Sequence, residues 1–157
     1  MIVYHGSWLA IPKPDCVHSR KRVDFGPGFY VTTLEEQAKR WSLRFREKKG
    51  GSVISKYELD DSVFEVARTL VFDAYDEAWL TFISGCRQGV EPKQYDLIMG
   101  GVANDRVFDT VELYLNSLIP IETALERLRI QTPSNQICLR SQEIMDKYLH
   151  YSGSETL

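Results

Sequence analysis

The chain has 157 residues, of which 43% are hydrophobic, and this is enough for one globular domain with a buried core. Its formal net charge of −3 argues against a protein that coats nucleic acid. Cys16, Cys86 and Cys138 are odd in number and far apart, which supports neither a disulfide framework nor a zinc site and predicts free, mostly buried thiols.

The sequence contains no run of eighteen or more apolar residues, and its first five residues form neither a basic leader nor a long apolar segment. We therefore expect a cytoplasmic protein without membrane contact. The length predicts a single domain over residues 1–150, and a flexible C-terminal tail is expected over residues 151–157.

Residues 2–5 are expected to form a first strand, which ends at Gly6 and Ser7. Small residues such as these let a backbone approach a ligand closely. The next unusual segment is Gly-Pro-Gly at residues 26–28, followed by the strand-forming sequence Phe-Tyr-Val at residues 29–31.

Thr33 and Glu36 match a capping box, which predicts that a helix begins directly after this strand. Helical spacing places four residues on one buried face of that helix: Leu34, Ala38, Trp41 and Phe45. The loop, strand and helix are together expected to form the walls of a small pocket.

Basic side chains gather around the same region. Residues 18–49 contain nine basic and four acidic residues, a net charge of +5 within a chain of −3. One interpretation is a solvated basic helix face. The other is a nearby anionic ligand, such as a pyrophosphate or a strand of RNA.

The middle of the chain alternates between strand and helix patterns. Residues 53–59 alternate in polarity, as expected for a strand with one buried face. Residues 63–72 fit either a strand or a short helix. Residues 76–86 have the apolar spacing of an amphipathic helix, and residues 95–101 indicate a strand that ends in a glycine pair.

The last third of the chain predicts three helices and a strand. Asn104 or Asp105 is expected to cap a helix with a buried stripe formed by Val107, Val111, Leu115 and Leu118. Pro120 separates that helix from a second one. Residues 136–140 predict a final strand, and Ser141 is expected to cap a terminal helix. The fold class is therefore α+β.

Motif searches exclude several common enzyme classes. The sequence has no phosphate-cradling Gly-Lys-Ser/Thr loop, no Gly-x-Ser-x-Gly elbow and no His-Glu-x-x-His motif. A P-loop NTPase, a serine hydrolase and a zinc protease are therefore not expected.

Three short segments, residues 4–7, 28–30 and 135–137, carry the chemical signal. Their order and character resemble the NAD-binding signature of the diphtheria-toxin-like branch of ADP-ribosyltransferases, which the poly-ADP-ribose polymerases share. That branch has His-Gly-Ser/Thr on a first strand, Gly-x-Gly-x-Tyr on a second strand and usually a Glu opening a late strand. The resemblance covers nearly the whole domain and implies an ADP-ribosyltransferase-like fold of split antiparallel β-sheets flanked by helices.

Residues 26–41, together with residues 95–96 and 102–106, also resemble a bacterial family catalogued as domain of unknown function 3990. That family is placed in the same superfamily, and some members lie beside a small partner gene in a toxin–antitoxin arrangement. This resemblance implies a toxin whose partner is a small antitoxin protein.

The resemblance implies a set of contacts to NAD and no metal. His5 would hydrogen-bond a ribose hydroxyl of the adenosine half, and Gly6 would offer backbone groups to the nicotinamide amide. Tyr30 would stack on the nicotinamide ring, with Trp41 on its other side. Four further residues are expected to line the cofactor site: Ser7, Arg20, Gly28 and Phe29.

Gln136 stands where many relatives have Glu, and we expect it to be catalytic together with Tyr30 and His5. Cleavage of the nicotinamide–ribose bond passes through an oxocarbenium-like state, which a hydrogen bond to the 2-hydroxyl and a nearby negative charge both stabilise. Gln can accept that hydrogen bond but carries no charge. Transfer of a single ADP-ribose is therefore expected rather than polymer formation, and Glu143 is a conceivable substitute carboxylate.

The sequence thus predicts an NAD-dependent mono-ADP-ribosyltransferase that modifies a protein or nucleic-acid target. Two alternatives stay open. One is an NAD glycohydrolase, in which water replaces the acceptor. The other is an inactive module that binds NAD, ADP-ribose or a protein in the same cleft. The inactive module is favoured by Gln136 and by Ala38, which stands where relatives often have a Ser.

Overall fold

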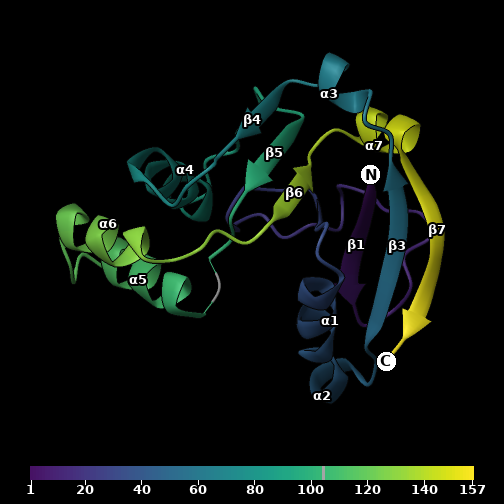
Figure 1. The fold of residues 1–157 in the computed structure, drawn as a ribbon, viewed down its shortest axis with the longest axis horizontal. Coiled ribbons are helices and arrows are strands. Elements are labelled where there is room, and N and C mark those ends of the chain that lie inside the picture. The colour runs from purple at the N-terminus through teal and green to yellow at the C-terminus, as the bar shows by residue number, and fades with distance from the viewer. Residues whose placement is uncertain (104) are drawn as a thin grey trace.

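The computed structural model describes residues 1–103 and 105–157 (Figure 1). Within them the chain forms seven strands and seven helices. The strands are β1 (Ile2–Ser7), β2 (Phe29–Val31), β3 (Val53–Leu59), β4 (Thr69–Val71), β5 (Leu97–Gly100), β6 (Gln136–Leu139) and β7 (Leu149–Thr156). The helices are α1 (Glu35–Leu43), α2 (Arg46–Lys49), α3 (Val63–Val66), α4 (Glu77–Arg87), α5 (Asp105–Leu115), α6 (Ile121–Arg129) and α7 (Gln142–Tyr148).

The strands build two sheets, which confirms the expected mixed α+β fold. Sheet A has the order β1-β3-β7 and is antiparallel throughout. Sheet B has the order β2-β6-β5-β4, in which β4 pairs with β5 in parallel. The sheets are otherwise antiparallel, as the resemblance implies, and β4 is the exception. The reason is the connection through α4, because a helical crossover returns the chain in the same direction.

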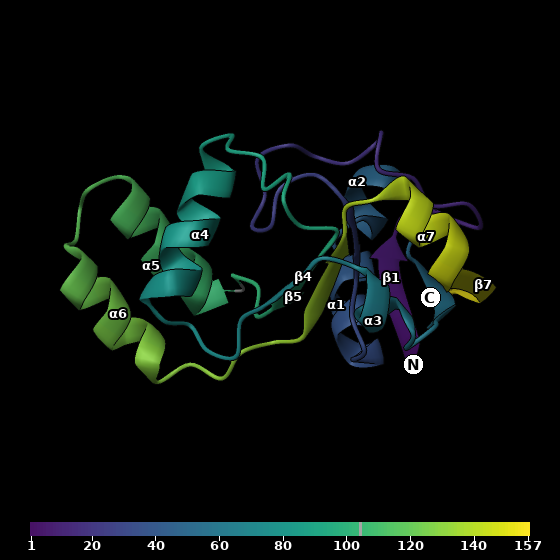
Figure 2. The same ribbon diagram turned by 90° about the horizontal axis from the view of Figure 1, so that it is seen from above.

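Sheet B lies in the middle of the molecule, between sheet A and the helices α4, α5 and α6 (Figures 1 and 2). Side chains alternate between the two faces of each strand, so sheet B contributes to two cores. The core on the side of sheet A contains, among others, Val3, Phe29, Tyr57, Leu97, Ile137 and Leu139. The core on the side of the three helices contains, among others, Phe25, Trp79, Ile83, Ile98, Val111 and Cys138.

Several elements agree with the sequence-based expectations. Helix α4 begins after Asp76, whose side chain accepts a hydrogen bond from the backbone N–H of Trp79. The ambiguous residues 63–72 contain both a short helix, α3, and a short strand, β4. Ser141 caps α7 by accepting from the N–H of Ile144. All three cysteines are free, two of them buried.

Helix α1 differs from the expectation at its beginning and on its buried face. Leu34 is the N-cap residue and no side chain caps the helix, so the capping box from Thr33 to Glu36 is wrong. The N–H of Leu34 bonds instead to the hydroxyl of Thr32. The buried residues are Ala38 and Ser42. Leu34 and Trp41 are exposed because the helix lies close against β1, where only small side chains fit.

The C-terminal residues form a strand, so the flexible tail expected over residues 151–157 is wrong. Strand β7 pairs with β3 along its length, from Leu149 opposite Leu59 to Thr156 opposite Val53. The segment is polar and mostly exposed, so its composition gave no strand signal. Its order comes from the backbone hydrogen bonds that the open edge of β3 offers.

Two further expectations concern α5 and the membrane. Asn104, one of the two expected cap residues, lies outside the described residues. Val107 and Val111 of the expected stripe are buried, whereas Leu118 lies beyond the end of α5 and is exposed.

Among the described residues, every helix is too short or too polar to span a bilayer.

Candidate functional site

The two sheets meet at neighbouring edges of β1 and β2. Tyr4 and Thr32 exchange two backbone hydrogen bonds, of 2.8 and 2.9 Å, and so form an isolated antiparallel bridge. Successive residues of a strand point their N–H and C=O groups to opposite edges. Gly6 therefore points both groups to the same edge as Tyr4, away from β3. Tyr30 points its groups to the same edge as Thr32, away from β6.

Gly6 and Tyr30 would be the next bonded pair if this bridge continued, but no hydrogen bond joins their backbones. Within the described residues, the N–H and C=O of Gly6 and the N–H of Tyr30 have no partner. The C=O of Tyr30 accepts a hydrogen bond from Nδ1 of His5, over 2.7 Å. We call Gly6 and Tyr30 the open pair. Unpaired backbone groups need a partner, so the open pair suits a ligand with adjacent donor and acceptor atoms.

His5 presents a hydrogen-bond acceptor beside the open pair. A carbonyl oxygen only accepts, so the bond to Tyr30 requires the proton on Nδ1 and leaves Nε2 as the acceptor. Nε2 has no hydrogen-bond partner within the described residues. The imidazole stacks on the Phe29 ring with 4.5 Å between centroids. Burial lowers the pKa of His5 more than its bond to Tyr30 raises it, which keeps the ring neutral.

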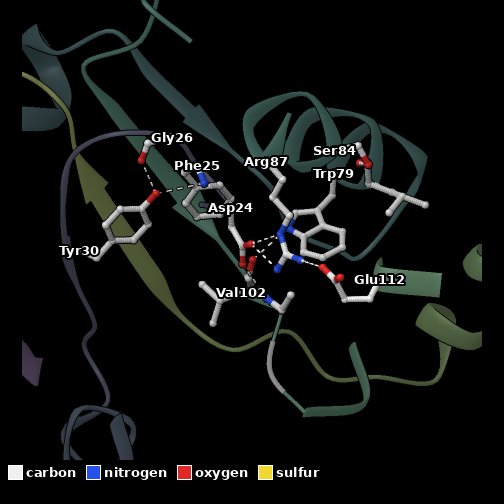
Figure 3. A network of polar contacts seen from close by, with 12 residues as sticks. Asp24, Phe25, Gly26, Tyr30, Trp79, Ser84, Arg87, Val102 and Glu112 are labelled. Carbon is white, nitrogen blue, oxygen red and sulfur yellow. Dashed lines mark hydrogen bonds and ion pairs between the residues drawn. The ribbon is translucent and has the colours of Figure 1, made fainter. Parts of the chain in front are cut away.

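The phenol of Tyr30 is fixed by the loop that precedes β2. Its hydroxyl accepts from the N–H of Phe25 over 3.1 Å and donates to the C=O of Gly26 over 2.5 Å (Figure 3). Burial raises the pKa of Tyr30 well above its ordinary value, and the Cys138 thiol beside it adds to the effect. The hydroxyl therefore stays protonated and acts as a structural link rather than as an acid or base.

Gln136 opens β6 and lies on the same face of sheet B as Tyr30. Tyr30 is paired with Cys138, and Gln136 is two residues away from Cys138, so the two side chains are diagonal neighbours on that face. The half-buried Gln136 amide has no hydrogen-bond partner in the described part of the chain and is reachable by solvent. It is thus free to bond a ligand near the open pair.

The two glycines expected to contact the cofactor are required by internal packing. A β-carbon on Gly6 would lie 2.2 Å from the carbonyl oxygen of Ala38 in α1. A β-carbon on Gly28 would lie 2.5 Å from the sulfur of Cys138. Each glycine thus has a structural reason that does not involve a ligand. A ligand contact at either position is left to the backbone groups.

Other expected residues have different environments. The Phe29 side chain is 6% exposed and belongs to the core between the sheets, and the Ser7 hydroxyl bonds to the backbone of Leu9. Arg20 is exposed. Trp41 is 41% exposed, with the guanidinium of Arg44 4.8 Å from its ring. The nicotinamide sandwich between Trp41 and Tyr30 stays a prediction.

The positive charge of residues 18–49 is partly neutralised by ion pairs within the protein. Lys39 forms ion pairs with Glu35 at 2.9 Å and with Glu36 at 3.1 Å. Whether the remaining positive charge is a solvated surface or faces an anionic ligand stays open. Glu143, the conceivable substitute carboxylate, is exposed in the first turn of α7.

Two surface hollows lie away from the open pair. One, of about 320 Å³, is lined by residues of α5 and the turn that follows it. The other, of about 460 Å³, lies between the start of α4 and the end of α6. We place the candidate site at the open pair because its unpartnered donors and acceptors point to a ligand, which volume alone does not. In the described residues, no group of histidine, cysteine or acidic side chains is arranged to hold a metal ion.

Sequence reasoning missed the ion pair between Asp24 and Arg87. It lies beside the Tyr30 loop, and Figure 3 shows Arg87 between Asp24 and Glu112. Asp24 and Arg87 are 63 residues apart, so no spacing rule connects them. The available signal was an acidic residue two positions before the Gly-Pro-Gly segment, and any of the chain's basic residues could have been its partner.

Comparisons with known proteins give one match. A family model described as "Protein of unknown function (DUF3990)" matches residues 1–151. No curated protein and no solved structure matches the chain.

Proposed function

The chain belongs to the DUF3990 family, and from this premise and the geometry at the open pair we propose that it is an NAD-dependent mono-ADP-ribosyltransferase. The second substrate is a protein or nucleic-acid acceptor. The reaction breaks the bond between nicotinamide and ribose and forms a bond between that ribose carbon and the acceptor. It releases nicotinamide and the acceptor's proton.

The open pair is the observation that carries the proposal. A carboxamide has an N–H donor and a carbonyl acceptor side by side, which complements the free C=O and N–H of Gly6. The nicotinamide half of NAD ends in such a group. A bound carboxamide would take the place that the next ladder pair would have filled between β1 and β2.

Three side chains around the open pair support the same ligand. Nε2 of His5 is an unpartnered acceptor, which suits a ribose hydroxyl. The Tyr30 ring is held by two hydrogen bonds to its hydroxyl, which favours stacking with an aromatic ligand because little conformational freedom is lost on binding. The free Gln136 amide can accept from the 2-hydroxyl of the reacting ribose.

An inactive binding module is the second candidate function. It is favoured by Gln136, which offers no negative charge to an oxocarbenium-like state. The NAD glycohydrolase differs from the transferase only in the acceptor, which is water. The part of a toxin, with a small antitoxin as partner, rests on the family resemblance alone.

Incubation of the purified protein with NAD labelled in its ADP-ribose half, with and without cell lysate, tests the proposal. Label on a macromolecule is the expected result. Free labelled ADP-ribose alone indicates the glycohydrolase. NAD binding without any turnover indicates the binding module, and the absence of NAD binding contradicts all three.

A Tyr30→Ala variant tests the location of the site. It removes the stacking ring, and we expect NAD binding to be lost in calorimetric titration. Tyr95→Ala is the matched control, because Tyr95 is also a half-buried tyrosine packed on the helical side of sheet B, away from the open pair. Wild-type affinity in a folded Tyr30→Ala protein would contradict the stacking role.

A further inference from the structure

Asp24 is a junction between parts of the chain that are distant in sequence. Its Oδ1 accepts from Nε and Nη2 of Arg87, the last residue of α4, at 2.8 and 2.7 Å. Its Oδ2 accepts from the N–H of Ala103 at 2.9 Å. Both side chains of the ion pair are 13% exposed, and Nη1 of Arg87 bonds Glu112 of α5 at 2.9 Å. One carboxylate thus fixes two loops against two helices (Figure 3).

The first loop leads from Asp24 to Tyr30. The residue after Asp24 is Phe25, whose N–H donates to the Tyr30 hydroxyl, and the C=O of Gly26 accepts from it. Gly26 has a φ of +75°, which forms the turn that brings these two backbone groups to the phenol. The position of the phenol therefore depends on the backbone that Asp24 holds.

The second loop, Gly101–Ala103, contacts the residues just before β6. The N–H of Val102 donates to the hydroxyl of Ser134, two residues before Gln136, and the C=O of Val102 accepts from Tyr75. Gly100, at the end of β5, is paired with Gln136 in sheet B. The segment from Gly100 to Ala103 therefore carries the constraint from Asp24 to the position of Gln136.

We propose that Asp24 is a positioning residue that couples the Tyr30 loop to the Gly101–Ala103 loop and so fixes the orientation of the Tyr30 ring relative to Gln136. Its role toward NAD rests on the proposed function. The coupling itself rests on the contacts of one carboxylate. Because a carboxylate accepts from both the guanidinium and the backbone N–H at full negative charge, an uncharged amide holds the two loops less firmly.

The test compares three variants with the wild type. Asp24→Asn weakens the junction. The double variant Asp24→Asn with Arg87→Gln also weakens it, but it removes both charges of the buried ion pair and leaves only Glu112, whose side chain is 43% exposed, without its partner. It therefore covers the case in which the single variant fails to fold. Asp96→Asn is the matched control, since Asp96 pairs with Arg68 at 2.8 Å near the opposite end of β5.

We expect amide hydrogen exchange at residues 25–26 and 102–103 to become at least about tenfold faster in the Asp24 variants and to stay unchanged in Asp96→Asn. The dissociation constant for NAD should rise about tenfold or more in the Asp24 variants only. Unchanged exchange in both loops would overturn the coupling. Faster exchange with wild-type NAD affinity would overturn the positioning role.

The two proposals fail in different ways. A wild-type protein that binds no NAD contradicts the proposed function, and it does so before any variant is measured. The exchange rates of the two loops need no NAD and judge the coupling independently. A loss of NAD affinity in Asp96→Asn as large as in Asp24→Asn would assign the effect to general destabilisation and overturn the positioning role.

Discussion

Three residues near the open pair each use one group for a structural contact and leave another group available to a ligand. His5 uses Nδ1 to bond the Tyr30 carbonyl and leaves Nε2 without a partner in the described residues. Tyr30 uses its hydroxyl for the loop and keeps its ring on the Gln136 face of sheet B. Gln136 is placed by its backbone pairing with Gly100 and keeps its whole amide free. Fixed positions of this kind lower the entropy cost of binding a ligand.

The lowered pKa of His5 predicts a pH effect on stability. In the folded protein burial disfavours the charged ring, so the unfolded chain binds more protons as the pH falls through the ordinary histidine pKa. The wild type should therefore lose stability between about pH 7.5 and about pH 5.5. His5→Phe keeps an aromatic ring against Phe29 and removes the titration, so its stability should fall less. Urea unfolding at both pH values measures the difference.

His18 and His150 are exposed and identical in the two proteins, so the comparison isolates the effect of His5. An equal loss of stability in the wild type and in His5→Phe would show that His5 does not resist protonation in the folded state.

Gln136→Glu tests the electrostatic argument at the reacting ribose. In the proposed reaction the change adds a negative charge near the oxocarbenium-like state, and such a contribution is commonly about 3 kcal/mol. We expect NAD turnover to rise by up to about a hundredfold or to stay unchanged if the acceptor supplies the charge. Release of labelled nicotinamide measures the rate. A clear decrease with unchanged NAD affinity would contradict the role given to Gln136.

At the level of elements, the close approach of α1 to β1 decides which side chains near the open pair are buried and which are exposed. Gly6 has no side chain because the carbonyl of Ala38 occupies that space. The same contact buries Ala38 and Ser42 and turns Trp41 outward. Helical periodicity alone put Trp41 on the buried face, because the pattern counts apolar residues and cannot know how near the neighbouring strand lies.

A Gly6→Ala variant tests this packing. A β-carbon 2.2 Å from a backbone oxygen forces α1 away from β1, and we expect the free energy of unfolding to fall by about 1–3 kcal/mol. Gly85→Ala in α4 is the matched control, since its β-carbon would meet only Val90 at ordinary contact distance. That control should be stabilised by about 0.5–1 kcal/mol. Denaturant unfolding of the three proteins distinguishes the cases, and an unaffected Gly6→Ala protein would contradict the close approach.

At the level of the whole molecule, sheet B joins the two cores, and sheet A depends on both ends of the chain. Strand β3 lies between the N-terminal β1 and the C-terminal β7. The N–H of Leu59 bonds the C=O of Met1, and the N–H of Leu157 bonds the C=O of Ser52. The position of β1, and with it His5 and Gly6, is thus supported by strand pairing that reaches the last residue.

Truncation after His150 tests this dependence. Removal of residues 151–157 leaves β3 unpaired on that edge from Val53 to Tyr57, and unpaired edges promote association between chains. We expect Tm to fall by roughly 5–10 °C and the truncated protein to self-associate at high concentration. Ser154→Ala keeps the backbone ladder and should behave like the wild type. A monomeric truncated protein with wild-type Tm would show that the segment contributes nothing to sheet A.

Local patterns were sufficient for the fold class, for the presence of α4 and for α7 with its Ser141 cap, since each depends on neighbours in sequence. The grouping of His5, Tyr30 and Gln136 came from the family resemblance, and their roles toward NAD stay predictions. The tertiary structure alone decided the strand β7, the parallel pairing of β4, the outward position of Trp41 and the ion pair of Asp24 with Arg87. It also decided that β1 and β2 separate after one bridge and leave Gly6 without partners. These features depend on which groups approach one another in the folded chain, and the order of residues in the sequence does not reveal those distances.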